Sequence, residues 1–202
     1  MKKLLKKYSL VLFFVGVFIP HQISNAVEKA VIVLTGQSNM ARSASNITAL
    51  MPGYDVINCS KGGTSVTQWQ RGNALYEDCV AKVQGRNVVG IMHFQGERDS
   101  YDPVVYSQWS ALTLQFFDNF REDIGADGVT VVYAQLGTPP TDRDRPYWQN
   151  IQSQQAHLYE SDATLRLIRT YTITPYCPAT GPHWCSAGYV TIAQKFVSKF
   201  LE

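Results

Sequence analysis

The chain has 202 residues, of which 45% are hydrophobic and 12% aromatic, with 18 Lys and Arg against 16 Asp and Glu. This length supports one domain with a sizeable core. Four of the lysines lie in the first 26 residues, which hold no acid, so residues 27–202 carry 14 basic and 16 acidic side chains. Without an excess of positive charge, nucleic-acid binding and electrostatic attraction to anionic membranes lose their simplest support.

Residues 1–26 have the three parts of a secretory signal peptide. A lysine-rich stretch at residues 2–7 precedes an apolar run of ten residues at 10–19, and Ser24-Asn25-Ala26 supplies small residues at the expected cleavage site. Because about 20 apolar residues are needed to span a bilayer, a cleaved signal is favoured over an anchor. We therefore predict an exported protein, periplasmic or extracellular, whose single domain comprises residues 27–202 and keeps no stable membrane anchor.

All four cysteines lie in the predicted mature chain, where an oxidising compartment favours disulfides. Four cysteines allow three pairings, and the sequence alone does not choose among them. Closeness along the chain favours Cys59–Cys79 and Cys177–Cys185. A zinc site is disfavoured because no CxxC or HxH spacing occurs.

Short apolar segments rich in Val and Ile alternate with stretches of helical periodicity. Near-continuous apolar runs are typical of strands buried on both faces of a parallel sheet, and alternation with helices implies right-handed crossovers. We expect a three-layer α/β/α sandwich with a five-stranded parallel sheet, for which the flavodoxin-like strand order 2-1-3-4-5 is suited. The expected strands are 30–34, 55–58, 88–94, 129–135 and 165–171, and the expected helices are 74–83, 105–120, 147–158 and 187–201.

Ligands bind such folds beyond the carboxyl ends of the strands, and three polar segments are expected there. Ser38 follows the first strand at a turn into a helix, where unsatisfied N–H groups suit a nucleophile that generates an oxyanion, although serine is also a common helix cap. The segment Gly62-Gly63-Thr64-Ser65 follows the second strand, and adjacent glycines let backbone amides approach a ligand. Gln95 follows the third strand, with a side-chain amide suited to a developing negative charge.

A serine nucleophile needs a base within hydrogen-bond reach, and residues 27–202 contain three histidines. His93 lies inside a predicted buried strand, and His157 lies on a polar helix. His183 lies on a loop directly before the last predicted helix. Elimination therefore favours His183 as the base.

These segments, in this order, resemble the SGNH hydrolase superfamily and, more narrowly, its sialate O-acetylesterase-like branch of carbohydrate acetylesterases. The similar blocks are Gly36-Gln37-Ser38-Asn39, Gly62-Gly63-Thr64-Ser65, Gln95-Gly96-Glu97-x-Asp99 and His183. The resemblance implies that Ser38 is the nucleophile and His183 the base. It also implies an oxyanion hole formed by the amides of Ser38 and Gly63 and the side chain of Gln95. The implied activity is removal of O-acetyl groups from carbohydrates, with no metal or organic cofactor.

One position departs from the superfamily pattern. An aspartate usually lies three residues before the histidine and orients the imidazole, but this chain has Thr180 there. A Ser–His dyad is favoured, with a backbone carbonyl holding the imidazole, because the other blocks are present. Two alternatives stay open: a catalytically impaired carbohydrate-binding protein, or a carboxylate elsewhere that orients the base, with Glu97, Asp99, Asp142 and Asp144 as candidates.

Some residues near these blocks have two interpretations each. Glu97 and Asp99 are more often loop-holding groups than catalytic acids. Trp69 and Trp184 flank the second and last blocks and are candidates for stacking on a sugar, although large aromatics usually belong to the core. A nucleotide- or flavin-binding function is disfavoured, because the sequence has neither of the two glycine-rich phosphate-binding motifs.

Overall fold

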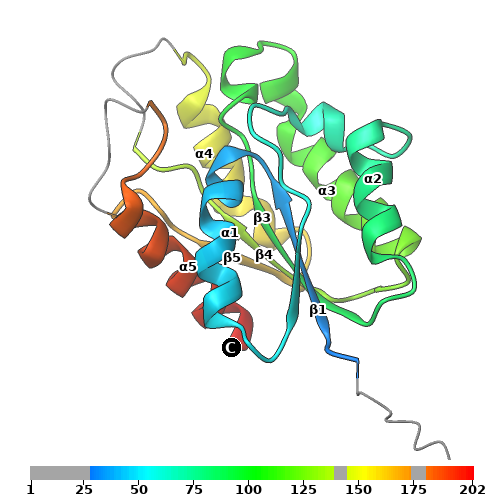
Figure 1. Cartoon of the computed structure of the whole chain (residues 1–202). Coiled ribbons are helices and arrows are strands. Elements are labelled where there is room, and N and C mark those ends of the chain that lie inside the picture. Colours follow the sequence, from blue (N-terminus) through cyan, green and yellow to red (C-terminus); the bar gives the residue numbers. More distant parts are fainter. Residues whose placement is uncertain (1–27, 139–144, 174–180) are drawn as a thin grey trace, which may run out of the picture.

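Figure 1 shows the computed structural model, which describes residues 28–138, 145–173 and 181–202. Strands and helices alternate along the chain, and the five strands form one parallel sheet in the order β2-β1-β3-β4-β5, which confirms the predicted order. The elements, with short 3-10 helices labelled η, are β1 (Val31–Gly36), α1 (Ser38–Leu50), β2 (Asp55–Asn58), η1 (Val66–Trp69), α2 (Ala74–Val83), β3 (Val88–Phe94), η2 (Asp99–Tyr101), α3 (Val105–Asp123), β4 (Thr130–Ala134), α4 (Trp148–His157), η3 (Leu158–Glu160), β5 (Leu165–Ile168) and α5 (Ser186–Leu201).

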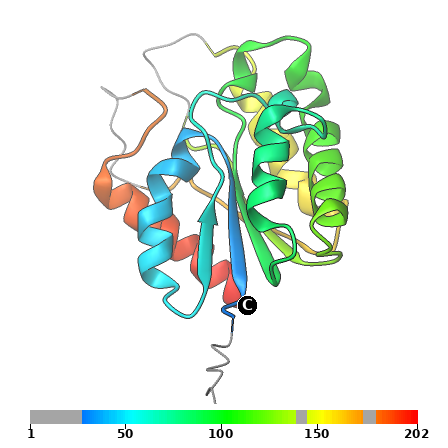
Figure 2. The same cartoon turned by 45° about the vertical axis from the view of Figure 1, so that its right-hand side comes forward.

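Helices cover both faces of the sheet. Helices α1 and α5 pack side by side on one face, and α2, α3 and α4 cover the other, as Figures 1 and 2 show from two directions. Every residue of β1 is buried, because a central strand between two helical layers has no solvent face. This explains the near-continuous apolar runs and confirms the predicted three-layer sandwich.

Two elements end at positions other than the expected ones. Strand β5 stops at Ile168 rather than at residue 171, because the neighbouring strand β4 stops at Ala134, the residue that pairs with Ile168. Helix α3 continues to Asp123 rather than to residue 120. It ends where Gly125 adopts φ +63° and its N–H bonds to the carbonyl of Glu122, since glycine is the residue best suited to a left-handed helix stop.

Strand β1 is the point at which successive crossovers run to opposite sides of the sheet, and the candidate active site described below lies at its carboxyl end. The chain crosses from β1 to β2 on one side and returns to β3 on the other, which is where open α/β sheets bind ligands. Gly36 at the end of β1 has φ +111°, and a Cβ on it would lie 2.1 Å from the carbonyl oxygen of Phe94. Only glycine therefore allows the close approach in which Gln37 donates its N–H to that oxygen at 2.9 Å.

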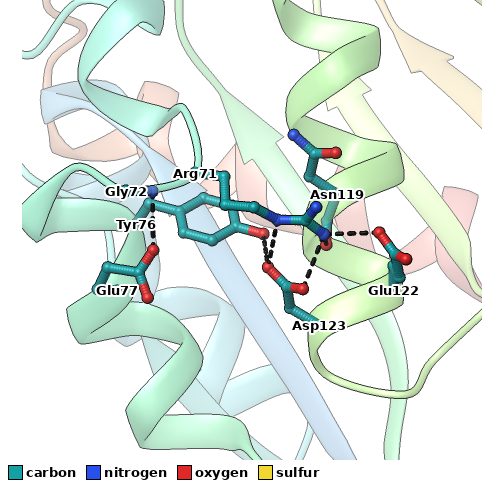
Figure 3. A network of polar contacts seen from close by, with 7 residues as sticks. All are labelled: Arg71, Gly72, Tyr76, Glu77, Asn119, Glu122 and Asp123. Atoms are coloured by element: carbon teal, nitrogen blue, oxygen red, sulfur yellow. Dashed lines mark hydrogen bonds and ion pairs between the residues drawn. The ribbon is translucent and has the colours of Figure 1, made fainter.

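A polar network fastens the segment after the glycine-rich loop to α3 (Figure 3). Arg71 donates to both carboxylate oxygens of Asp123, at 2.8 and 2.7 Å, and to Glu122 at 2.6 Å. The hydroxyl of Tyr76, on α2, donates to Asp123 at 2.5 Å, and burial raises the pKa of Tyr76. Exposed ion pairs contribute little stability singly, but this group joins two helices around a fully buried tyrosine.

A disulfide joins Cys59, directly after β2, to Cys79 in α2, with a Cα–Cα distance of 5.5 Å. This pairing was predicted and is confirmed. The other predicted pairing involves Cys177, which lies outside the described residues, as does the predicted signal peptide at residues 1–26. Across the described ranges, no helix combines the length and hydropathy needed to traverse a bilayer.

Candidate active site

Ser38 and His183, which are 145 residues apart, meet beyond the carboxyl ends of the strands. Ser38 is the first residue of α1, and its Oγ lies 2.8 Å from Nε2 of His183. Gln37 takes the N-cap position of this helix, without a side-chain capping bond. The Ser38 hydroxyl is therefore bonded to an imidazole, which the helix-cap interpretation does not predict.

Both side chains line a cleft of about 450 Å³ that also contains the glycine-rich loop. A Cβ on Gly62 would lie 3.5 Å from Cβ of Ser38, so the loop backbone runs beside the serine. The next residue, Gly63, adopts φ +75°, a conformation that favours glycine. N–H groups in the first turn of α1 have no acceptor within the helix. The residues lining the cleft are Gln37, Ser38, Gly62, Gly63, Glu97, Arg98, Tyr101, Arg145, Pro182 and His183.

The side chain of Gln95 lies beneath this loop, which differs from the expected position in an oxyanion hole. Its amide nitrogen donates to the carboxylate of Asp99 and, at 3.3 Å, to the carbonyl of Thr64. Its amide oxygen accepts from the indole of Trp109 at 2.8 Å. Gln95 is fully buried and does not line the cleft. Both of its amide hydrogens are bonded within the protein, so neither is directed at the cleft. We assign it to supporting the loop.

Asp99 is a loop-holding residue in this structure. Its carboxylate accepts the backbone N–H of Val66 at 3.1 Å in addition to the amide of Gln95. Burial raises the pKa of the Asp99 carboxyl, although these hydrogen bonds act in the opposite direction. Asp99 thereby links the end of β3 to η1, the element that follows the glycine-rich loop.

Glu97 is also buried, with 2% of its surface exposed, and burial raises the pKa of its carboxyl. Its carboxylate accepts the side-chain amides of Gln37 and Asn39. Its backbone carbonyl accepts from the guanidinium of Arg145 at 2.7 Å. Both predicted loop-holding acids are therefore bonded to other segments.

The two tryptophans predicted as sugar contacts belong to the core, and that prediction is wrong for this structure. Trp69 is fully buried, packs on Phe116 at 5.5 Å between ring centroids and donates its indole N–H to Thr64. Trp184 is 3% exposed and packs on Phe94 at 5.9 Å. Neither lines the cleft, because burial of a large aromatic surface stabilises the core more than exposure in a crevice would.

The other two histidines lie away from the cleft. His157 is exposed, and its Nδ1 lies 2.9 Å from Glu160. His93 is buried in β3, where Nδ1 lies 2.9 Å from the hydroxyl of Thr35 and the ring packs against Phe117 at 5.1 Å. His93 is therefore a core residue, and burial lowers its pKa to about 3.

This depressed pKa predicts that His93 makes the protein acid-sensitive. The unfolded chain binds a proton at His93 near pH 6.5 and the native protein only near pH 3, so the contribution of His93 to stability falls as pH falls through this window. We expect wild type to lose roughly 2–3 kcal/mol more unfolding free energy than His93→Asn between pH 7 and pH 4.5.

Urea unfolding of both proteins at the two pH values measures this difference. Glu97 and Asp99, whose pKa values are raised, act in the opposite sense in both proteins, so the comparison isolates His93. Parallel losses in wild type and variant would contradict the prediction.

The sequence interpretation missed three residues of the cleft wall: Arg98, Tyr101 and Arg145. The guanidinium carbon of Arg145 lies 4.5 Å from the ring centroid of Tyr101 and 5.1 Å from that of Trp148. The contact with Tyr101 joins segments far apart in sequence and leaves no local pattern, whereas Trp148 lies three residues after Arg145. Arg98 could have been found from the sequence, because it directly follows Glu97 in a block that was already expected at the site.

The other candidate carboxylates, Asp142 and Asp144, and the departing position Thr180 lie outside the described residues. Within the described ranges, no three His, Cys, Asp or Glu side chains gather in an arrangement that could hold a metal ion.

The fold is that of the SGNH/GDSL hydrolases. Residues 51–202 match the family of carbohydrate esterases described as sialic acid-specific acetylesterases, and the chain belongs to this family. The match begins after Ser38, so the structure rather than the family match places the serine at the site. An Arabidopsis thaliana protein named as a probable carbohydrate esterase is 23% identical over 88 residues, which cover 41% of this chain and 34% of that protein.

Solved structures show the same fold at low identity. A structure from Arabidopsis thaliana has a TM-score of 0.72 at 14% identity and covers 86% of this chain and 98% of that one. A carbohydrate acetylesterase from Xanthomonas citri has a TM-score of 0.65 at 13% identity, covering 82% and 54%. A protein from Parabacteroides merdae described as a GDSL-like lipase has a TM-score of 0.63 at 12% identity, covering 86% and 96%.

Proposed function

We propose that the protein is an exported serine esterase that removes O-acetyl groups from carbohydrates. The observation that carries the proposal is the 2.8 Å contact between Ser38 Oγ and His183 Nε2 in a cleft beside a glycine-rich loop. Membership of a carbohydrate esterase family supplies the substrate class. A hydroxyl bonded to an imidazole is the arrangement that activates a serine nucleophile.

In the proposed reaction, His183 takes the Ser38 proton as Oγ attacks the acetyl carbonyl carbon. The N–H groups of Ser38 and Gly63 stabilise the oxyanion that forms. The tetrahedral intermediate collapses, His183 protonates the departing sugar oxygen, and an acetyl-serine remains. Water activated by His183 then attacks this ester and releases acetate, which restores both residues. No metal or organic cofactor takes part in these steps.

Export is supported by the disulfide between Cys59 and Cys79. Structural disulfides persist in oxidising compartments such as the periplasm and the cell exterior. The lysine-rich and apolar segments at residues 1–26 supply the expected signal.

The charge of the cleft wall supports an acidic sugar, such as a sialic acid, as the acetylated substrate. Arg98 is exposed on this wall, and the part of the chain that the structure describes offers it no ion pair or side-chain hydrogen bond. The carboxylate of Glu97 is buried and bonded to amides. The charge of Arg98 also acts on Asp102, and a guanidinium that lines the same cleft as Ser38 favours a carboxylate on the substrate.

We expect Arg98→Ala to lower kcat/KM roughly fivefold for an O-acetylated acidic sugar, the loss of one exposed ion pair. Hydrolysis of an O-acetylated neutral sugar is expected to stay unchanged. The control is Arg42→Ala, because Arg42 is exposed on α1 and does not line the cleft. Equal losses on acidic and neutral substrates would remove the support for an acidic substrate.

Acetate release from a panel of O-acetylated glycans tests the proposed function directly. The panel contains sialosides, xylan and peptidoglycan, with Ser38→Ala as the control. Acetate release by wild type alone is the expected result. No release from any member, by a folded wild-type protein, would contradict the proposal.

A further inference from the structure

Glu97 is a buried carboxylate for which the reaction described above has no step. Gln37 and Asn39, the residues directly before and after Ser38, donate their side-chain amides to it, one to each carboxylate oxygen. Glu97 and both amide residues are at most 2% exposed. The backbone on both sides of the candidate nucleophile is therefore tied to a single acid.

Asn39 extends this group to the segment that carries the candidate base. The same Nδ2 that donates to Glu97 donates its second hydrogen to the carbonyl of Pro182, at 3.1 Å, and Pro182 directly precedes His183. The Asn39 side-chain oxygen accepts the hydroxyl of Tyr189, in α5, at 2.7 Å. One amide thus connects the carboxylate with the His183 segment and with α5.

Both oxygens of the Glu97 carboxyl group accept a hydrogen bond in this structure, one from Gln37 and one from Asn39. Each amide therefore presents its nitrogen to Glu97, because only the nitrogen of an amide side chain can donate. If the Asn39 amide were rotated by 180°, its oxygen would face the carboxylate and its nitrogen the Tyr189 hydroxyl, and Pro182 would lose its donor.

The Glu97 backbone is held as firmly as its side chain. Its carbonyl oxygen accepts from Arg145 at 2.7 Å and from the hydroxyl of Ser100 at 2.7 Å. The carboxylate is therefore a fixed point for the side chains bonded to it.

We propose that Glu97 is a positioning residue that holds Ser38 and His183 in register through Gln37 and Asn39, and so compensates in this chain for the aspartate missing at position 180. The inference rests on the proposed esterase function. Glu97 acts through the residues that flank the two catalytic groups, without touching the reacting atoms.

Glu97→Gln tests this role with almost no change in size. The new amide nitrogen cannot accept a hydrogen bond, so the amide that it faces has to rotate its oxygen toward residue 97 or lose its hydrogen bond. Because a displacement of about 1 Å in a catalytic group can lower the rate about 10²-fold, we expect kcat to fall roughly 10- to 100-fold on p-nitrophenyl acetate, with KM changed less than about twofold. The rate at which a fluorophosphonate labels Ser38 is expected to fall in parallel.

A second variant exchanges the donor and the acceptor. In Gln37→Glu/Glu97→Gln, the amide of residue 97 donates to residue 37, and its oxygen accepts from Asn39, so every hydrogen bond of the group is restored with the same net charge. We expect kcat to return to within roughly fivefold of wild type, as strongly coupled neighbours predict.

The matched control is Asp162→Asn. Asp162 is also a hydrogen-bonded carboxylate, held by Arg121 at 2.7 Å and by Thr164, but it precedes β5 and lies at the opposite end of the sheet from the cleft. Its replacement is expected to lower the melting temperature and to leave kcat of the folded enzyme unchanged.

Three outcomes would overturn the inference while leaving the proposed function intact. The first is wild-type kcat in Glu97→Gln, and the second is a well-folded double variant that stays as slow as Glu97→Gln. If Glu97→Gln does not fold, the double variant is the test. The third outcome is then a double variant that also fails to fold, or that folds but does not hydrolyse esters. A folded wild-type protein that neither hydrolyses acetyl esters nor reacts with the fluorophosphonate contradicts the proposed function itself, and the inference with it.

Discussion

Replacement of Ser38 by alanine is expected to lower kcat for acetyl esters by at least about 10⁴-fold. The Ser38 hydroxyl supplies the atom that attacks the carbonyl in the proposed reaction, and it lies 2.8 Å from Nε2 of His183. The substitution removes only the Ser38 Oγ atom, which lines the cleft and is not part of the hydrophobic core. The free energy of unfolding should therefore change by less than about 1 kcal/mol. Acetate release and urea unfolding measure the two effects.

The side chain of Ser38 takes no part in the bonds of Asn39 and Gln37 to Glu97, so we expect these bonds to persist in the variant. A loss of activity then reports the missing hydroxyl rather than a displaced loop. Binding of a deacetylated glycan to Ser38→Ala should be unchanged, because the rest of the cleft is intact. The variant also separates the esterase from a carbohydrate-binding protein without turnover. If wild type and Ser38→Ala released acetate at equal rates, the nucleophile would be a different residue.

His183→Ala is expected to have a comparable effect, a fall in kcat of at least about 10⁴-fold. Without the imidazole, Ser38 loses the base that lies 2.8 Å from its hydroxyl, and the leaving alcohol loses the acid that protonates it in the proposed reaction. The variant leaves space in the cleft, so added imidazole should restore part of the activity. Initial rates at increasing imidazole concentration measure this rescue.

The matched control is His157→Ala. His157 is exposed and bonded to Glu160, and its replacement is expected to leave kcat unchanged. A His183→Ala enzyme that is as fast as wild type, or a His157→Ala enzyme that is as slow as His183→Ala, would show that the base has been assigned to the wrong histidine.

Glu97 and Asp99, the two buried acids of the Gln95-Gly96-Glu97-x-Asp99 block, have different roles. Residue type alone could not predict these roles, because each role depends on the partners that the carboxyl group meets in the folded protein. Asp99 holds Gln95 and the N–H of Val66, whereas Glu97 holds the amides beside Ser38. They are two residues apart in sequence, yet they support different walls of the same cleft. Gln95 was expected among the oxyanion donors, and its engagement by Asp99 removes it from that role.

Local patterns were sufficient for the architecture of the fold. Apolar runs alternating with helical periodicity predicted the five strands and the layers, because burial on both faces of a parallel sheet requires continuous apolar segments. The strand order was inferred from the fold class, and the structure confirms it. Gly36 and Gly63 occur where the backbone must adopt positive φ, so the turns of the first two blocks are also encoded locally. Cys59 and Cys79 paired as their spacing suggested.

Contacts between distant segments were decided only by the tertiary structure. Trp69 and Trp184 are packed in the core, because an aromatic side chain buries more of its surface away from water there than in a crevice. The bond between Ser38 and His183, and the bonds of Glu97 to both neighbours of that serine, join residues about 60 to 145 positions apart. Hydrogen bonds form where folding brings a donor and an acceptor within about 3 Å, and that distance depends on the packing of the whole sheet and its helices.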